Sequence, residues 1–413
     1  MTASLHNQAK LSILDYAFSL LDSADSPQDF TIVLHLSNPP SVERLRAGAT
    51  SAMNRFPTSA CTLKNRSWVC AANGRTQLPL NGNGKPSLES FVNDRFDVRR
   101  QTPVRQALFT DAETGTRLVT RFHHVAADGL SAALWLGHQL TVAYGLIDPE
   151  TTTASFDGVT LRESQTSVRR SAFAFSGASD PLWTTNYVPS GARQLHTINF
   201  PANDLRERCR RARGFTYSDL LATCTLEVLS QWNQKHAPKR AQKIGLWYPL
   251  NIRGNPTSGF GNGTSRIRLY AQYAPHASLI DKAREVRKQV SWAIKHGEWV
   301  VPKVPLFTRL PRPIVAPLLN GYLKQPTVDM ATAVFSHADR WAGDATEAFK
   351  YVTRIECVGL LHARQRLALN GATHQGQTWL TFTYDPALLD AGDVRELAGM
   401  YEEQIALARK ELA

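Results

Sequence analysis

The chain has 413 residues, of which 43% are hydrophobic and 20% are charged. This composition is typical of a soluble globular protein, and the length exceeds the ~250–300 residues at which a single hydrophobic core stops growing. No uninterrupted apolar stretch approaches the ~18 residues of a membrane-spanning helix. We therefore expect two domains and no transmembrane segment.

The net charge is +12, which favours anionic partners such as nucleic acid, a membrane surface, an acidic protein or a phosphorylated cofactor. No groove-reading motif or aromatic-rich basic stripe accompanies this charge, so we expect no nucleic-acid partner. The densest basic cluster consists of Arg206, Arg208, Arg210, Arg211 and Arg213. Two interpretations stay open for it: a solvated helix face, or a docking site for cofactor phosphates or an acidic carrier protein.

The cysteines lack the paired short spacing of a zinc site or a disulfide framework. The five are Cys61, Cys70, Cys209, Cys224 and Cys357. We therefore expect neither a metal site nor a disulfide framework. The opening residues lack the basic-then-apolar pattern of a secretion signal, so we expect a cytoplasmic protein.

The first half of the chain alternates between helical and strand patterns. Apolar spacing predicts helices at Leu11–Leu21, at Ser41–Phe56 with Ser41 as N-cap, and at Gly129–Tyr144. Apolar and β-branched runs predict strands at Phe30–Leu36, Trp68–Ala71, Val104–Thr110 and Arg117–His123.

Residues 151 to about 191 are rich in Ser, Thr, Gly and Pro and lose hydrophobic periodicity. We interpret this stretch as a crossover between two units of comparable size. The predicted organisation is an N-terminal half at residues 1–150, a crossover linker at 151–195 and a C-terminal half at 196–413.

The second half repeats the style of the first, so the predicted fold class is mixed α/β in two similar halves. The predicted helices are Thr216–Trp232, where Thr216 and Asp219 have capping-box spacing, Ala277–Lys295 and Ala391–Leu412. The predicted strands are His196–Phe200, Ile244–Leu250, Arg266–Gln272, Ala331–Ser336, Tyr351–Val358, Arg366–Leu369 and Gln377–Tyr384.

The stretch RFHHVAADG, residues 121–129, ends a predicted strand and begins a predicted helix. A turn of this kind can hold a side chain in a cleft between rigid elements. The imidazole of His124 can accept a proton near neutral pH, so it can deprotonate a hydroxyl or an amine. Asp128 can anchor the turn by pairing with an arginine, and Gly129 leaves room beside the imidazole.

The adjacent His123 and His124 have two alternatives to a catalytic role. The pair can be purely structural, or it can bind a metal ion. Neighbouring residues on a strand point to opposite faces, and no Glu stands at the spacing of a zinc-protease helix. The metal site is therefore disfavoured.

The string HHVAADG resembles the HHxxxDG signature of the chloramphenicol acetyltransferase-like superfamily. That superfamily includes nonribosomal peptide condensation domains, BAHD acyltransferases, wax ester synthases and phthiocerol dimycocerosyl transferases. Weaker likenesses follow in order: Leu11–Asp15 to LSxxD, Gly214–Leu221 to GATxNDxxLA, Pro249–Arg253 and Gly261–Ser265 to PxNxR…GNxxS, and Val334–His337 to a V-S-N segment. The DFGWG motif of BAHD enzymes is missing. The resemblance implies two halves that form a V, with an active-site channel at their interface.

The resemblance also implies roles for individual residues. His124 matches the catalytic base, His123 a support of the turn, and Asp128 the acid that pairs with an arginine. Arg253 is the candidate partner, with a surface arginine as the alternative. Ser336 is a candidate hydroxyl donor to the oxyanion, with an ordinary strand-end serine as the alternative.

The implied function is acyl transfer from a thioester donor to a hydroxyl or amine of a small-molecule acceptor, without a covalent intermediate, bound cofactor or metal. Acyl-coenzyme A is the expected donor, in secondary metabolism. One alternative is a free-standing condensation enzyme that uses a donor or acceptor bound to an acyl or peptidyl carrier protein. Another is an inactive carrier-docking module. We expect a monomer.

Val304–Leu323 is apolar but interrupted by prolines and arginines, so it cannot span a bilayer as a regular helix. It is interpreted as a loop and short helix that cover the core. The alternative is an interfacial patch that admits an apolar substrate, which leaves peripheral membrane contact open.

Overall fold

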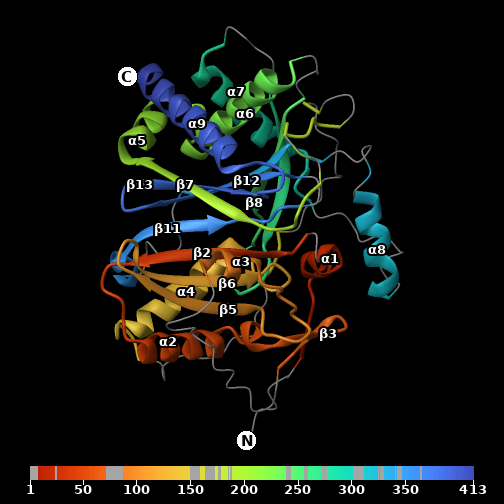
Figure 1. Cartoon of the computed structure of the whole chain (residues 1–413), viewed down its shortest axis with the longest axis vertical. Helices are drawn as coiled ribbons and strands as arrows, with labels where there is room; N and C mark the ends of the chain where they lie inside the picture. The colour runs from red at the N-terminus through yellow and green to blue at the C-terminus, as the bar shows by residue number, and fades with distance from the viewer. Residues whose placement is uncertain are drawn as a thin grey trace, which may run out of the picture.

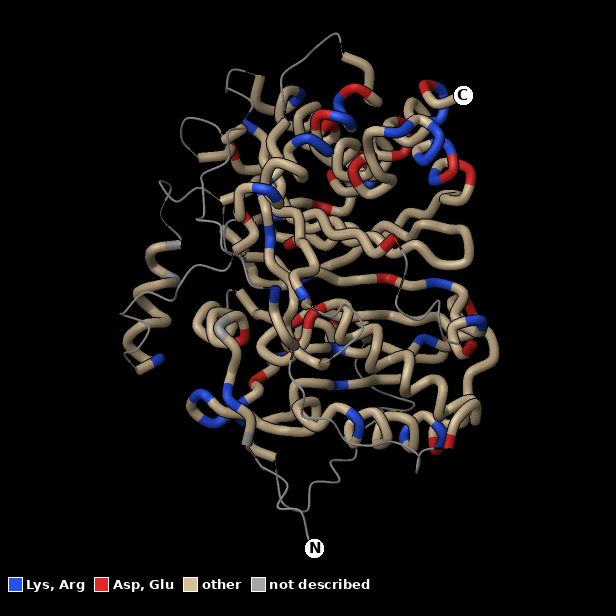
Figure 2. Tube along the Cα trace, turned by 180° about the vertical axis from the view of Figure 1, so that it is seen from behind, with Lys and Arg blue, Asp and Glu red and all other residues tan. Residues whose placement is uncertain are grey.

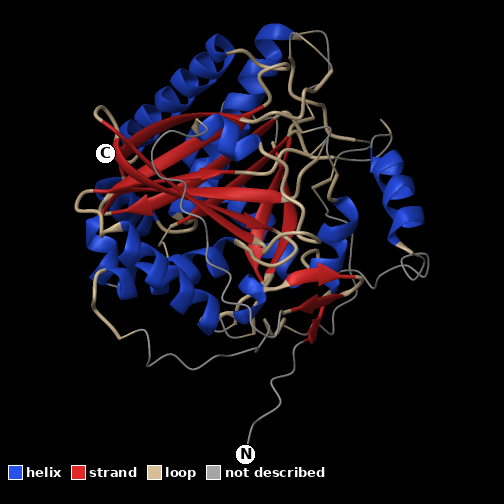
Figure 3. Ribbon diagram, turned by 60° about the horizontal axis from the view of Figure 1, so that its bottom comes forward, coloured by secondary structure: helices blue, strands red, loops and turns tan. Residues whose placement is uncertain are grey.

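The computed structural model describes residues 8–23, 26–70, 87–148, 159–162, 173–174, 178–184, 186, 188–238, 243–254, 259–271, 277–300, 311–323, 325, 330–339, 341, 347–362 and 365–413. Two large sheets, one above the other in Figure 1, form the centre of this part of the chain, with helices packed around them. Figure 3 shows the same arrangement with the strands at the centre.

The first large sheet has the strand order β11-β2-β6-β5 and is antiparallel throughout. Its strands are β2 (Asp29–Leu36), β5 (Val104–Asp111), β6 (Gly115–His123) and β11 (Val352–Val358). Alternate residues of β2 face opposite layers. Ile32 and Leu34 join the cluster under α2 (Val42–Arg55) and α4 (Gly129–Ala143), and Val33 packs with Phe91 of α3 (Leu88–Asn93). Both faces are covered, so β2 is almost continuously buried.

The second large sheet has the order β7-β13-β12-β10-β8-β9. β10 is parallel to β8 and β12, and the other neighbours are antiparallel. The strands are β7 (Gln194–Pro201), β8 (Gly245–Asn251), β9 (Thr264–Tyr270), β10 (Ala333–Ala338), β12 (Leu367–His374) and β13 (Gln377–Tyr384). The covering helices are α5 (Asn203–Ala212), α6 (Tyr217–His236), α7 (Leu279–Lys295) and α9 (Ala391–Glu411). Thr216 and Asp219 form the predicted capping box of α6.

The two sheets do not divide cleanly at the crossover, because β11 from the end of the chain pairs with β2 in the first sheet. Arg193, just before β7, is also anchored in the first half, where it donates to the carboxylate and carbonyl of Asp29 and to the carbonyl of Val92. Much of the predicted linker at 151–195 lies outside the described residues, so its boundaries stay a prediction.

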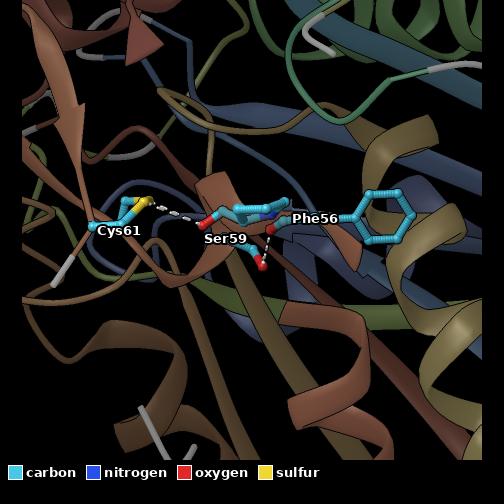
Figure 4. Close-up of a disulfide and its surroundings, with 5 residues drawn as sticks. Phe56, Ser59 and Cys61 are labelled. Atoms are coloured by element: carbon cyan, nitrogen blue, oxygen red, sulfur yellow. Dashed lines mark hydrogen bonds between the residues drawn. A yellow bond between two sulfur atoms is a disulfide. The ribbon is translucent and has the colours of Figure 1, made fainter. Parts of the chain in front are cut away.

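A small antiparallel sheet joins β1 (Gln8–Lys10), β4 (Ser67–Val69) and β3 (Thr62–Lys64). A disulfide links Cys61 and Cys70 across the ends of the β3–β4 hairpin, beside the 3₁₀ turn η1 (Pro57–Ala60) (Figure 4). The expectation that the scattered cysteines form no disulfide is therefore wrong for this pair. The hairpin brings together two residues nine positions apart, whereas Cys209, Cys224 and Cys357 are free.

Helix α1 (Ile13–Leu21) packs against α8 (Arg312–Leu323) at one side of the molecule (Figure 1). Tyr16 and Leu20 of α1 contact Val315 of α8. Three other apolar residues of α8, Ile314, Leu318 and Tyr322, are exposed. The short helix confirms part of the interpretation of Val304–Leu323, of which residues 304–310 lie outside the described residues. Peripheral membrane contact stays a prediction.

Within the described residues, no helix is long and apolar enough to cross a bilayer.

The arginine cluster lies on α5 and at its end, and four of its five members pair with acidic neighbours. Within α5, Arg208 pairs with Asp204, and Arg210 and Arg211 pair with Glu207. Arg206 pairs with Asp339, which directly follows β10. Figure 2 shows basic and acidic residues interspersed along the helices near the C-terminus. This arrangement supports a solvated helix face over a phosphate dock.

Candidate active site

The turn between β6 and α4 carries the HHxxxDG string. β6 ends at His123 and α4 begins at Gly129, with Asp128 as its N-cap. The Asp128 carboxylate accepts a hydrogen bond of 2.9 Å from the amide of Ser131. Gly129 is exposed, and a side-chain carbon there would meet no atom within 4 Å. Space beside the turn is therefore free of protein atoms at this residue.

Asp128 and Arg253 form the predicted ion pair, with Nη2 of Arg253 2.5 Å from Oδ1 of Asp128. Both side chains are buried. The other carboxylate oxygen, Oδ2, accepts hydrogen bonds from the amide of Gly263 and the hydroxyl of Thr264. Because all of these partners belong to the second half, Asp128 fastens that half to the turn that carries His124. Asp128 does not contact the His124 ring through a hydrogen bond.

The segment from Gly259 to Thr264 lies against the turn like a strap. Its backbone at Gly261 exchanges hydrogen bonds with the hydroxyl of Ser131, while Arg253 donates to the carbonyls of Gly259 and Gly261. A side-chain carbon on Gly263 would lie 2.3 Å from Cγ of Arg253. The close approach of the strap to Arg253 therefore requires glycine at this position.

His124 lies where the two halves meet and is half-buried. Its ring stacks on Phe18 of α1 at 4.5 Å and contacts Phe30 of β2 at 4.8 Å. Nδ1 lies 3.2 Å from Oδ1 of Asn262 in the strap, and the backbone amide donates to the carbonyl of Gln28. Burial lowers the pKa of His124 to about 4, partly offset by the hydrogen bond to Asn262 and the charge of Asp128. The ring is therefore neutral near pH 7.

His123 points to different surroundings, as expected for neighbouring strand residues. It is fully buried, contacts the edge of Phe96 at 5.5 Å, and places Nε2 3.6 Å from the carboxylate of Asp22. Nδ1 accepts a long hydrogen bond from the amide of Val125. These contacts fit a residue that supports the turn from the core side.

Asn262 and Asp15 complete the surroundings of His124 and were missed as functional residues. Asn262 donates through Nδ2 to Oδ1 of Asp15 at 2.7 Å and to the backbone carbonyl of His124. Asp15 also forms the capping box of α1 with Ser12. Both residues lie in motifs that the resemblance singled out, LSxxD and GNxxS. Their place in these motifs could have singled them out from the sequence, but the contact between Asp15 and Asn262 depends on the folded chain.

Ser336 lies on β10, half-buried and in register with Asn370 of β12. Its neighbour His337 turns to the helix side, where its ring nitrogens lie 2.8 Å from the hydroxyl of Ser218 and 2.9 Å from that of Thr373. His337 of β10 and Ser218 of α6 are therefore bonded to each other. The oxyanion role of Ser336 stays a prediction.

The described residues contain no group of three His, Cys, Asp or Glu side chains placed to hold a metal ion. A small crevice opens near the contact between the halves, lined by Pro27, Arg193, Leu361, His362 and Asp385 among others. A channel that passes His124 from both faces stays a prediction.

Neither a protein-family model nor a curated protein sequence matches the chain. Solved structures do match over nearly the whole length. Polyketide synthase associated protein 5 from Mycobacterium tuberculosis superposes with a TM-score of 0.64 at 14% identity, covering 97% of this chain and 98% of that one. The starter condensation domain of rhizomide synthetase, in complex with C8-CoA and Leu-SNAC, gives 0.63 at 12% identity, covering 98% and 95%.

The chain has the condensation-domain fold. This result confirms the predicted fold class. The epimerization domain from the third module of tyrocidine synthetase B is also similar, with a TM-score of 0.62 at 10% identity, covering 98% of each chain. Condensation and epimerization domains therefore share this architecture, so the reaction must be argued from the residues around His124.

Proposed function

We propose that the protein transfers an acyl group from a thioester donor to a hydroxyl or amine acceptor, with His124 as general base. The observation that carries this proposal is the position of the His124 ring, which lies where the two halves meet, stacks on Phe18 and has Nδ1 3.2 Å from Oδ1 of Asn262. Burial lowers its pKa to about 4, which favours the neutral, proton-accepting form near pH 7. Among the described residues, Nε2 makes no hydrogen bond with the protein, so it is available to an acceptor.

The reaction follows from this arrangement. Nε2 of His124 takes the proton of the acceptor as its oxygen or nitrogen attacks the thioester carbonyl. The new bond creates a tetrahedral oxyanion, for which Ser336 is the proposed donor. The oxyanion collapses, the C–S bond breaks, and the thiolate takes the proton back from Nε2. Atoms and charge balance without a covalent enzyme intermediate.

Acyl-coenzyme A is the proposed donor. Two observations support this donor: the similar rhizomide synthetase domain is in complex with C8-CoA, and the net charge of +12 suits the phosphates of coenzyme A. An acyl or peptidyl carrier protein is the second candidate, favoured by the similarity to synthetase domains. The cytoplasmic location stays a prediction, and the Cys61–Cys70 disulfide bears against it.

The test is acyl transfer and thiol release from coenzyme A esters of graded chain length, offered with a panel of alcohols and amines. Transfer by the native protein that is lost in His124→Ala supports the proposal. The same panel with acyl-carrier-protein thioesters distinguishes the two donors. Equal transfer by both proteins with every competent pair would show that the base lies elsewhere, and transfer by neither with any donor would favour the docking module.

A further inference from the structure

The side-chain amide of Asn262 lies across His124 and contacts it twice. One end of the amide faces the backbone carbonyl of His124 and Oδ1 of Asp15, and the other end lies 3.2 Å from Nδ1 of the ring. Asn262 is 2% exposed and Asp15 is 8% exposed, so water competes little for these contacts. The amide therefore bridges the main chain and the ring of the same residue.

The orientation of this amide follows from the chemistry of its neighbours. A backbone carbonyl can accept a hydrogen bond but cannot donate one. The end that faces the carbonyl of His124 must therefore be the NH₂ group, whatever the protonation state of Asp15. The oxygen Oδ1 is then the end that faces Nδ1, and an amide oxygen can only accept. Nδ1 of His124 must carry the hydrogen.

A neutral imidazole has one N–H hydrogen, so Nε2 must then carry the lone pair. We propose that Asn262, oriented by Asp15, is a positioning residue that holds His124 in the Nδ1–H tautomer and leaves Nε2 as the proton acceptor. This role rests on the proposed function of His124 as general base. The opposite tautomer would present an N–H to the acceptor and could not take its proton.

Asp15 is itself held in place. Its Oδ2 accepts a hydrogen bond of 3.0 Å from the amide of Ser12 in the α1 capping box, which leaves Oδ1 for Asn262. The order of contacts is thus Ser12, Asp15, Asn262 and His124. These contacts join the start of α1 to the strap, so the LSxxD and GNxxS segments both contribute to the surroundings of His124.

An amide suits this position better than a carboxylate would for a neutral base. A carboxylate in direct contact with the ring would favour the imidazolium strongly, because opposite charges stabilise the charged form. The acid of the motif, Asp128, is instead occupied by Arg253, Ser131, Gly263 and Thr264. Asn262 therefore supplies orientation without adding a full charge beside the ring.

The first measurement is ¹⁵N NMR of the native protein, labelled at its twelve histidines, near pH 7. Comparison with His124→Ala identifies the His124 signals. We expect a protonated Nδ1 and an unprotonated Nε2 for His124. An Nε2–H tautomer in the native protein would overturn the inference, and it would do so without any variant of Asn262 having to fold.

The second measurement is the kinetics of Asn262→Ala, with Asn199→Ala as the matched control, since Asn199 is exposed on β7. We expect kcat of Asn262→Ala to fall by roughly 10–100-fold, as for other residues that orient a reactive imidazole, with little change in KM for the donor. Its His124 signals should shift towards the Nε2–H form.

The two measurements separate the inference from the function it rests on. If His124→Ala is inactive but Asn262→Ala keeps full kcat with an unchanged tautomer, Asn262 has no positioning role and the general base stands. If His124→Ala keeps full activity, the proposed function fails. The native Nδ1–H tautomer, together with a loss of kcat in His124→Ala and in Asn262→Ala but not in Asn199→Ala, supports both.

Discussion

Arg253 lies 2.5 Å from Asp128 across the contact between the two halves, and their side chains are 0% and 1% exposed. The carboxylate also caps α4 and holds the strap through Gly263 and Thr264. The ion pair thus holds the turn that carries His124 against the strap.

Asp128→Ala should lower the free energy of unfolding by roughly 3–5 kcal/mol, because it removes the carboxylate that pairs with the buried Arg253 charge. The helix also loses its N-cap, which is typically worth ~1 kcal/mol. Urea unfolding measures the change. Glu207→Ala, which breaks an exposed pair on α5, is the control and should stay within ~0.5 kcal/mol. An Asp128→Ala effect as small as the control would show that the pair is not structural.

His124→Ala should reduce kcat by ~10²–10⁴, the usual contribution of a positioned general base. The half-buried ring packs on Phe18 and Phe30, so we also expect a modest loss of folding stability in this variant. His123→Ala should behave differently, because its fully buried ring supports the turn from the core and its loss should act mainly through stability. Paired kinetics and unfolding curves check both. Equal kinetic defects in two stably folded variants would contradict these roles.

The pH profile of kcat/KM should lack a limb near the usual histidine pKa of ~6.5. Burial lowers the pKa of His124 to about 4, so the proton-accepting form persists as pH falls and is lost near that value. The rate should therefore be nearly constant between about pH 5.5 and 7. Short assays after a pH jump measure it before acid unfolding intervenes. A half-maximal rate near pH 6.5 would show that the ring is not shielded in the free enzyme.

Folding stability should fall as pH drops below about 6.5. Burial also lowers the pKa of His138 to about 4 and of His337 and His362 to about 3. Between ~6.5 and these values the unfolded chain binds protons that the folded chain does not, so protonation favours unfolding. The raised pKa of Asp15 and Asp219, caused by burial, works in the opposite direction at lower pH. Urea midpoints at pH 7 and 5 test the sign, and a midpoint that rises on acidification would refute it.

Gly263→Ala should lower both stability and kcat, since its new carbon would lie 2.3 Å from Cγ of Arg253 and displace the strap that carries Asn262. We expect the free energy of unfolding to fall by about 1–3 kcal/mol, the typical cost of overpacking. Gly399→Ala in α9 is the matched control, because a carbon there meets nothing within 4 Å and alanine favours a helix. Unfolding midpoints and steady-state kinetics compare the pair. A neutral Gly263→Ala would mean that the strap tolerates displacement.

Sequence signals alone predict most helices and strands, the turn that carries the HHxxxDG string, and the candidate residues His124, Asp128 and Arg253. Apolar periodicity reports which face of an element is buried, and capping residues such as Ser41 and Thr216 mark where helices begin. These signals are local. The short helices α3 and α5 were not predicted, because α3 has six residues and α5 is dominated by charged residues.

Only the tertiary structure decided which elements meet. Periodicity does not say against what a face is buried, so β11 joining the first sheet could not be predicted from its pattern. Pairing of Cys61 with Cys70 depended on a hairpin between two three-residue strands. The contact of Asn262 with His124, 138 positions apart, and with Asp15, 247 positions apart, arises because docking of the strap excludes water and leaves polar groups to satisfy one another.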